Sequence, residues 1–331
     1  EIGCKIKKEL IMNFYFAPME GITGYIYRRA YHSCFHPMDK YFTPFIAPKQ
    51  DKTLNSKEKN DILPEHNEGM RVVPQILTNR AEDFIRTAEK LREFGYQEVN
   101  LNLGCPSATV VSKKKGSGFL GEREALDRFL DNLFENLNMD ISIKTRLGMD
   151  EPEEFYRLLE IFNKYPLKEL IIHPRVQADY YRNSPDRKVF ADALKMSRNS
   201  VVYNGDIFYE GDYEQFTASF PETGAVMLGR GILANPGLPG RLCGEKQPSK
   251  QEIKQFLDRL AGDYREVLSG ERDVLFRMKE LWFYLGFLFT NPEKYVKKIK
   301  KAQRLCDYEE AVRTLFREQE LAENGAFRPS V

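Results

Sequence analysis

The sequence predicts an α/β protein, an eight-stranded β/α (TIM) barrel followed by a small C-terminal helical bundle. Three observations support this prediction. Short β-branched or aromatic runs alternate with amphipathic segments up to roughly residue 240. Eight such runs occur, the number that a β/α barrel needs. Beyond the polar link 244–249 the pattern is only helical. A doubly wound sheet is the alternative, because alternation alone does not separate the two folds.

The elements follow in a regular order. The expected strands span 14–18, 40–47, 71–77, 98–103, 141–147, 169–175, 200–205 and 225–230. Between most of them lie segments with apolar residues on one helical face, at 80–95, 123–137 and 153–165. Gly95 is expected to end the first of these helices. We therefore assign residues 13–243 to a catalytic barrel.

The remaining chain divides into a short N-terminal segment and a helical region. Four helices are expected at 250–268, 272–289, 291–305 and 307–323, within a domain spanning 250–331. Residues 1–12 precede the first strand, and the chain begins with Glu rather than Met. We expect this segment to be an expression remnant or a disordered N-terminus.

The composition excludes several classes of protein. Of the 331 residues, 42% are hydrophobic and 30% charged, which is typical of a globular chain. A net charge of +1 argues against a global attraction to nucleic acid, although a local basic face remains open. The five scattered cysteines include no CxxC pair and the four histidines are dispersed, so neither a disulfide framework nor a metal site is expected. With no long apolar run, a cytoplasmic protein without a membrane segment is expected.

The active site of a β/α barrel lies at the C-terminal ends of its strands. These ends carry Pro18, Met19, Gln75, Asn102, Cys105, Lys144, Arg146, His173, Arg175, Asn204, Asp206, Gly229 and Arg230. The last two ends, NGDI (204–207) and GRGIL (229–233), place glycine just before a helix. Glycine lets backbone N–H groups approach a phosphate, so this pair favours a phosphorylated cofactor over simple turns.

Cys105 lies between a strand and a glycine- and lysine-rich loop, in the run NLNLGCPSATVVSKKKGSGFLG (100–121). An unperturbed thiol stays mostly protonated at pH 7 and can act as an acid. Gly116 and Gly118 are expected to let a mobile loop close. A nucleophilic thiolate stays possible if Lys113–Lys115 lower the pKa of the thiol, and an inert buried cysteine is a third interpretation.

A basic segment lies in the helical region. The run KYVKKIKKAQR (294–304) places lysines around an apolar seam of Val296 and Ile299, and Lys297, Lys298 and Lys301 are the candidates for contacts with phosphates. A solvated helix face is the alternative. If the face contacts RNA, binding should weaken steeply with salt.

Several motifs, in order along most of the chain, resemble those of the tRNA-dihydrouridine synthases, flavoenzymes that reduce uracil in tRNA to dihydrouridine. These are APMEGITG (17–24), NLNLGCPS followed by Lys113, Gly116, Ser117 and Gly118, IIHPR, VVYNGDI, VMLGRGILANP and MKELWFYLG (278–286). The chain departs from the family pattern at three places, of which the first two concern the substrate subtype. Ser-Ala-Thr follows GCP, Glu280 replaces a usual His, and Tyr41-Phe42-Thr43-Pro44 replaces a Thr-Glu pair.

The resemblance implies FMN as the cofactor, NADPH or NADH as a transient reductant, and tRNA as the partner of the helical domain. It places FMN at Ala17, Pro18, Met19, Gln75, Lys144, His173, Asn204, Gly205, Asp206, Gly229 and Arg230. Cys105 falls on the position of the proton donor to C5 of uracil, and Asn102, Arg146 and Arg175 fall at or near the substrate. A monomer is expected.

Two other functions stay open at this point. A flavin barrel could reduce a free pyrimidine or another small molecule, although the lysine-rich helix argues against this. A non-catalytic tRNA-binding module that kept the barrel is the other alternative, and it would bind tRNA without flavin.

Overall fold

The computed structural model describes residues 12–49 and 54–328. Within these residues nine parallel strands form one sheet in the order β3-β2-β1-β9-β8-β7-β6-β5-β4. The strands are β1 (Asn13–Phe16), β2 (Lys40–Phe42), β3 (Val72–Val73), β4 (Gln75–Ile76), β5 (Glu98–Leu103), β6 (Asp140–Thr145), β7 (Leu170–Ile172), β8 (Val201–Tyr203) and β9 (Ala225–Leu228). Most of the segments expected to be strands are therefore strands, with shorter bounds.

The sheet closes into a barrel because β3 and β4 are two parts of one run. Pro74 lies between them and has no N–H to donate to a neighbouring strand, which splits the run. β3 pairs with β2, and β4 pairs with β5. The two ends of the strand order are thus consecutive in the chain. The predicted barrel of eight strands is confirmed, with 71–77 as one strand run, and the doubly wound alternative is wrong.

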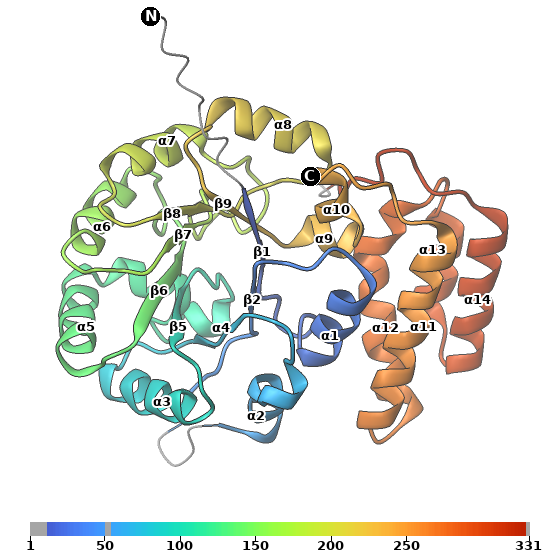
Figure 1. The fold of residues 1–331 in the computed structure, drawn as a ribbon, viewed down its shortest axis with the longest axis horizontal. Coiled ribbons are helices and arrows are strands. Elements are labelled where there is room, and N and C mark those ends of the chain that lie inside the picture. Colours follow the sequence, from blue (N-terminus) through green and yellow to red (C-terminus); the bar gives the residue numbers. More distant parts are fainter. Residues whose placement is uncertain (1–11, 50–53, 329–331) are drawn as a thin grey trace, which may run out of the picture.

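Helices surround this barrel, as Figure 1 shows. Those up to residue 242 are α1 (Tyr25–Cys34), α2 (Ser56–Ile62), α3 (Ala81–Glu93), α4 (Ala108–Val111), α5 (Arg123–Asn136), α6 (Glu154–Phe162), α7 (Arg187–Met196), α8 (Glu210–Ser219), α9 (Arg230–Ala234) and α10 (Leu238–Leu242), with 3₁₀ turns η1 (Pro64–His66) and η2 (Gly116–Gly121). The stop expected at Gly95 is found, since α3 ends two residues earlier and Gly95 has a φ of 92°.

The helical region lies beside the barrel, next to α1 and α9 (Figure 1). It contains α11 (Lys250–Val267), α12 (Glu271–Leu285), η3 (Gly286–Leu288), α13 (Glu293–Lys301) and α14 (Leu305–Glu318). These are the four expected helices. A capping box at Ser249 and Glu252 begins α11, where the polar link ends. The domain bounds 13–243 and 250–331 stay predictions, and residues 1–11 and 329–331 fall outside the described part.

Two apolar clusters hold the barrel together. The larger lies between the sheet and the helices and continues through the helical region to Leu315. The smaller contains Tyr15, Ala17, Phe42, Val73, Ile171, Val202, Ala225 and Met227, on neighbouring strands. Burying each of the larger apolar side chains, such as Phe42 or Ile171, contributes about 1.5–3 kcal/mol to folding. With apolar strand bodies packed in this way, the polar residues gather at the strand ends.

Candidate functional site

The strand ends predicted to carry the chemistry meet in one cleft at the barrel mouth. Its lining includes Ala17, Pro18, Met19, Lys144, His173, Asn204, Gly205, Asp206, Gly229 and Arg230, together with Tyr181 and Phe208. Ten of the eleven positions predicted to bind cofactor are among these, and Gln75 is the one outside the lining. Segments more than 200 residues apart in the chain are thus brought together by the barrel.

Lys144 is the most unusual charge in this cleft. Part of its side chain faces the cleft, but burial and the neighbouring Arg146 lower the pKa of its ammonium group to about 7. The opposing influence comes from the thiol of Cys105 rather than from a carboxylate. A buried ammonium normally has an anionic partner. The residue therefore suits an anionic ligand at the mouth.

Three further polar side chains form a connected cluster around Asp206. Arg175 donates from Nη1 to Oδ1 of Asp206 at 3.0 Å and from Nη2 to Oδ2 at 2.5 Å. Arg230 donates from Nη2 to Oδ1 at 2.5 Å. The Nη1 group of Arg175 also lies 3.0 Å from Nε2 of His173. Because arginine can only donate, Nε2 accepts and Nδ1 carries the imidazole proton.

His173 is electrically neutral in this setting. Burial and the cations Arg146, Lys144, Arg175 and Arg230 lower its pKa well below the ordinary value. A neutral imidazole protonated at Nδ1 can donate one hydrogen bond to a ligand without adding charge. The site thus has one neutral donor beside several cations.

Tyr181 lies at the rim of the mouth, over the arginines. The guanidinium of Arg230 lies 4.5 Å from the centre of the Tyr181 ring, and that of Arg146 lies 5.3 Å from it. The ring remains 41% exposed. An exposed aromatic ring over cations at a site mouth can stack on a planar ligand.

A chain of side-chain amides crosses the strands below Cys105. Nδ2 of Asn100 donates to the Ser142 hydroxyl at 3.0 Å, and Nε2 of Gln75 donates to Oδ1 of Asn100 at 2.8 Å. Asn102 donates to Oε1 of Gln75 at 2.7 Å. Oδ1 of Asn102 accepts the backbone N–H of Gly104 and of Cys105, at 3.0 and 2.9 Å. In this structure the side chains of Gln75 and Asn102 therefore form hydrogen bonds within the protein. Those of Asn102 fix the start of the Cys105 loop.

Arg146 and Arg175, both almost fully buried, also bind backbone carbonyls. Arg146 donates to the carbonyls of Gly104, Val176 and Tyr180. It therefore joins the loop that carries Cys105 to the loop that carries the two tyrosines. Arg175 donates from Nε to the carbonyl of Asn183 at 2.5 Å. The predicted substrate contacts of these arginines stay predictions.

The loop after Cys105 is packed against the protein in this structure, and the expected mobility of the loop stays a prediction. The N–H and the hydroxyl of Ser117 both donate to the carbonyl of Cys105, at 3.1 and 2.9 Å. A Cβ at Gly116 would lie 2.8 Å from that carbonyl oxygen, and one at Gly118 would lie 2.7 Å from the Val111 oxygen. The glycines therefore permit close packing.

The pKa of the Cys105 thiol is raised, chiefly by burial. A backbone hydrogen bond at Ser107 and the cations Arg146 and Lys144 lower it by less. The cations that lower this pKa are thus Arg146 and Lys144. The sequence had left open such an effect from Lys113–Lys115. A raised pKa favours the neutral thiol. Cys105 is therefore better suited to act as a general acid than as a nucleophile.

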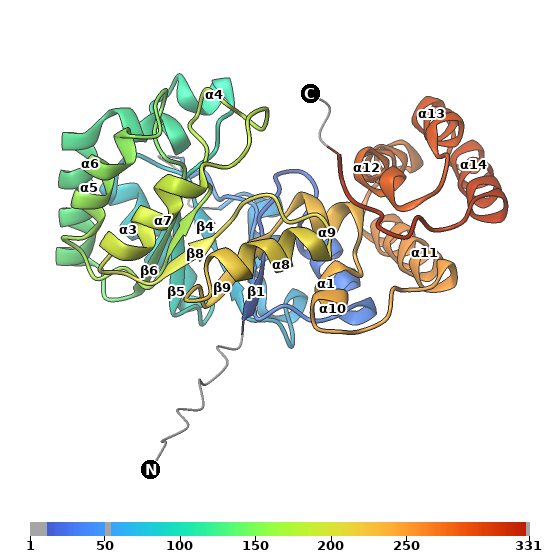
Figure 2. The same cartoon turned by 90° about the horizontal axis from the view of Figure 1, so that it is seen from above.

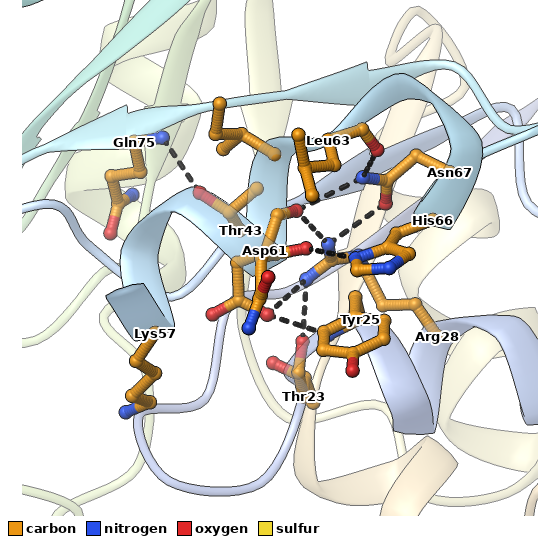
Figure 3. Close-up of polar contacts among 12 residues, drawn as sticks. Thr23, Tyr25, Arg28, Thr43, Lys57, Asp61, Leu63, His66, Asn67 and Gln75 are labelled. Atoms are coloured by element: carbon orange, nitrogen blue, oxygen red, sulfur yellow. Dashed lines mark hydrogen bonds and ion pairs between the residues drawn. The ribbon is translucent and has the colours of Figure 1, made fainter. Parts of the chain in front are cut away.

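Sequence reasoning missed the network that holds the loop after β1 (Figure 3). Arg28 is fully buried and donates to the carbonyls of Thr23 and Asp61, at 2.9 and 2.6 Å, and to Asn67. Oδ1 of Asp61 accepts the N–H of Tyr25 at 2.6 Å. The network thus anchors the end of the segment 17–24, whose start lines the mouth. An arginine within a helix pattern carries no signal of such burial.

The lysines of α13 lie away from the barrel mouth residues. Lys297, Lys298 and Lys301 are exposed and, with helical spacing, share one face with Lys294. Tyr295 and Ile299 face the core instead. The three lysines are accessible to a polyanion. Among the described residues, no hydrogen bond or ion pair joins them to the residues of the mouth.

The described residues contain neither a cluster of metal ligands nor a membrane-spanning helix. Between residues 12 and 328, apart from the gap at 50–53, no group of three or more His, Cys, Asp or Glu side chains is arranged to hold a metal ion. In the same part of the chain, no helix has both the length and the apolar character required to cross a membrane.

Comparisons with known proteins agree on one family. A family model described as dihydrouridine synthase matches residues 15–328. A probable tRNA-dihydrouridine synthase of Staphylococcus aureus is 26% identical over 277 residues, 81% of each chain. The tRNA-dihydrouridine(16) synthase of Haemophilus influenzae is 26% identical over 311 residues, 89% of this chain and 97% of the relative. A solved variant of NCR from Zymomonas mobilis, 12% identical, aligns with a TM-score of 0.50 over 70% of this chain and 86% of that chain, a likeness of fold alone.

Proposed function

Because this chain belongs to the dihydrouridine synthase family, we propose that it is a flavin-dependent oxidoreductase that reduces uridines of tRNA to dihydrouridine. The observation that carries the proposal is the position of Cys105 beside Arg146 and Lys144, because Lys144 lines the mouth of the barrel. Relatives named tRNA-dihydrouridine synthases align with most of the chain, which supports tRNA as the substrate.

The cofactor is FMN, reduced transiently by NADPH or NADH. Lys144 offers a charge to an anionic group, His173 a neutral donor, and Arg230 a guanidinium for the phosphate. Gly205 and Gly229 bring backbone close to the ligand. The cleft encloses about 60 Å³ as it stands, which is small beside ligand pockets of roughly 300–1,000 Å³. We therefore expect the exposed Tyr181 ring to move when flavin binds.

When bound, reduced FMN supplies a hydride to C6 of uracil. Cys105 holds the proton for C5, and its raised pKa keeps the thiol protonated at neutral pH. Asn102 fixes the backbone of Cys105, and Arg146 fixes the carbonyl of Gly104. These contacts hold the acid in place while the base is reduced, which is the usual source of efficiency in general acid catalysis.

The RNA is held by two regions. Asn102, Arg146 and Arg175 contact the substrate near the mouth, and the exposed α13 lysines contact phosphates of the tRNA. A uridine within folded tRNA has to leave its stack to reach the mouth, at a cost of a few kcal/mol. Phosphate contacts far from the mouth offset this cost.

The first experiment is the visible absorption spectrum of the purified protein, followed by reduction with NADPH and re-oxidation with or without unmodified tRNA. Flavin bands, with re-oxidation accelerated by tRNA, are expected. If re-oxidation proceeds at the same rate with and without tRNA, the protein is instead a small-molecule reductase. A protein that binds tRNA but no FMN would be a binding module.

The second experiment changes Cys105 to Ala. We expect dihydrouridine formation to fall by about 10²–10⁴-fold while FMN content stays unchanged, because a general acid contributes about that factor. Dihydrouridine in the tRNA is counted by mass spectrometry. In the unchanged protein, activity should persist to a pH above the ordinary thiol pKa, since the raised pKa delays loss of the proton. Full turnover by the Ala variant would refute the role of Cys105.

A further inference from the structure

A second cleft lies in the helical region, outside the barrel mouth. It has a volume of about 540 Å³ and is formed by the end of α12, η3, the start of α13 and the segment 322–328. Trp282, Phe283, Phe287 and Phe289 give it aromatic walls, and Lys300 and Arg328 line it as cations. Glu293 is an acidic side chain in the same lining.

Of the aromatic side chains that line this cleft, Phe283 is the most exposed. It is 49% exposed, whereas Trp282 and Phe289 are 1% and 3% exposed and form the inner wall. The Nζ of Lys300 lies over the Phe283 ring, 5.3 Å from its centre. Because the lysine side chain is long and flexible, it can leave the ring to a stacked base and bind the phosphate, and an exposed aromatic ring with a nearby cation is how single-stranded nucleic acid is held.

The cleft and the barrel mouth lie on opposite sides of one buried side chain, that of Phe327. The ring of Phe327 lies 5.1 Å from that of Phe287 and 6.0 Å from that of Phe283. On its other side, the Arg230 guanidinium lies 5.5 Å from the Phe327 ring. Figure 2 shows the last part of the chain returning from α14 past α12 toward the barrel. One RNA strand can therefore reach both the mouth and the cleft.

We propose that this cleft binds an unpaired nucleotide of the tRNA substrate. Its base stacks on Phe283, and its phosphate is held by Lys300 and Arg328. The charge of the cleft fits this occupant, since its lining has two cations, Lys300 and Arg328, against one acidic side chain, Glu293. The inference rests on the proposed tRNA-reducing function and deepens it by assigning a second contact with the substrate.

The test compares binding of an unmodified tRNA transcript by the flavin-loaded protein and its variants. Phe283→Ala should raise the Kd by about 5- to 150-fold, the effect of removing one stacked base. Phe283→Trp, which keeps an aromatic face, should bind within about threefold of the unchanged protein. Lys300→Gln should reduce the salt dependence, as the slope of log K against log salt, by about 0.7–0.9.

Phe276→Ala is the matched control. Phe276 lies on the same helix, is 66% exposed and does not line the cleft. Its loss should leave the Kd unchanged. The protein has a single tryptophan, Trp282, in the cleft wall, so its fluorescence should change on tRNA binding in the unchanged protein.

Three results would overturn the inference. If Phe283→Ala binds tRNA as tightly as the unchanged protein, the cleft holds something else, a protein or another part of this chain, while the proposed function stands. If the unchanged, flavin-loaded protein neither binds tRNA nor is re-oxidised by it, the proposed function fails as well. Weak binding by both Phe283→Ala and Phe276→Ala would show a general effect on α12 and also overturn it.

Discussion

Lys144 lies at the mouth of a cationic cleft and has a pKa of about 7, which has consequences for proton binding. Because the folded-state pKa lies below the unfolded value of about 10.4, the folded protein binds fewer protons between these pH values. Stability of the flavin-free protein therefore rises with pH across this window. An anionic ligand beside Lys144 would reverse the effect of burial and raise the pKa again.

Binding of FMN at pH 8 is therefore expected to take up nearly one proton per protein. Isothermal titration calorimetry in buffers of different ionisation enthalpy measures this number directly. Lys144→Met should abolish the uptake. Lys188→Met, a change at an exposed lysine of α7, should leave it intact. FMN binding without any proton uptake in the unchanged protein would place Lys144 away from the anionic part of the cofactor.

At the scale of elements, the loop 104–121 depends on two glycines. Gly116 has a φ of 56°, and an added Cβ would lie 2.8 Å from the carbonyl oxygen of Cys105 and 2.9 Å from Val110. We expect Gly116→Ala to cost about 1–3 kcal/mol of folding free energy and to displace Cys105. Urea unfolding measures the first effect. The alkylation rate of Cys105, followed by peptide mass spectrometry, measures the second.

Gly262→Ala is the control for that change. Gly262 lies within α11, and an added Cβ there would meet no atom within 4 Å. Alanine should therefore stabilise the protein by about 0.5–1 kcal/mol, because glycine is a poor helix former. If Gly116→Ala has the same effect as Gly262→Ala, the loop is not tightly packed at Gly116.

The barrel elements were predictable because each depends on local pattern. Runs such as 98–103 and stops such as Gly95 are visible along the chain, and the strand ends of a barrel then bring Lys144, His173 and Arg230 together. The contacts of Arg28 with Asp61, or of Asn102 with Gln75, were not predictable. Each joins residues 27 or more apart, and the type of residue alone does not say that it is buried. The exposed Phe283 was likewise indistinguishable from a core residue.

At the scale of the whole molecule, the helical region is joined to the loop that leads into the mouth. Nη1 of Arg277, on α12, donates to the carbonyl of Gly21 at 2.6 Å. Phe327 packs between Phe208 of the barrel and Tyr284 of α12. Because the two regions share these contacts, the helices have a fixed position relative to the mouth, as the proposed tRNA-binding role requires.

The α13 lysines make the last prediction at this scale. Changing Lys297, Lys298 and Lys301 together to Gln should lower the slope of log K against log salt by about 2–3 for tRNA binding, since each phosphate contact contributes about 0.7–0.9. The control changes Lys188, Lys195 and Arg198, exposed residues on or next to α7, and should leave the slope unaltered. FMN content should stay the same in both. If the α13 variant keeps the full slope and affinity, this face is solvated surface, and the phosphates of tRNA are neutralised by cations nearer the barrel mouth.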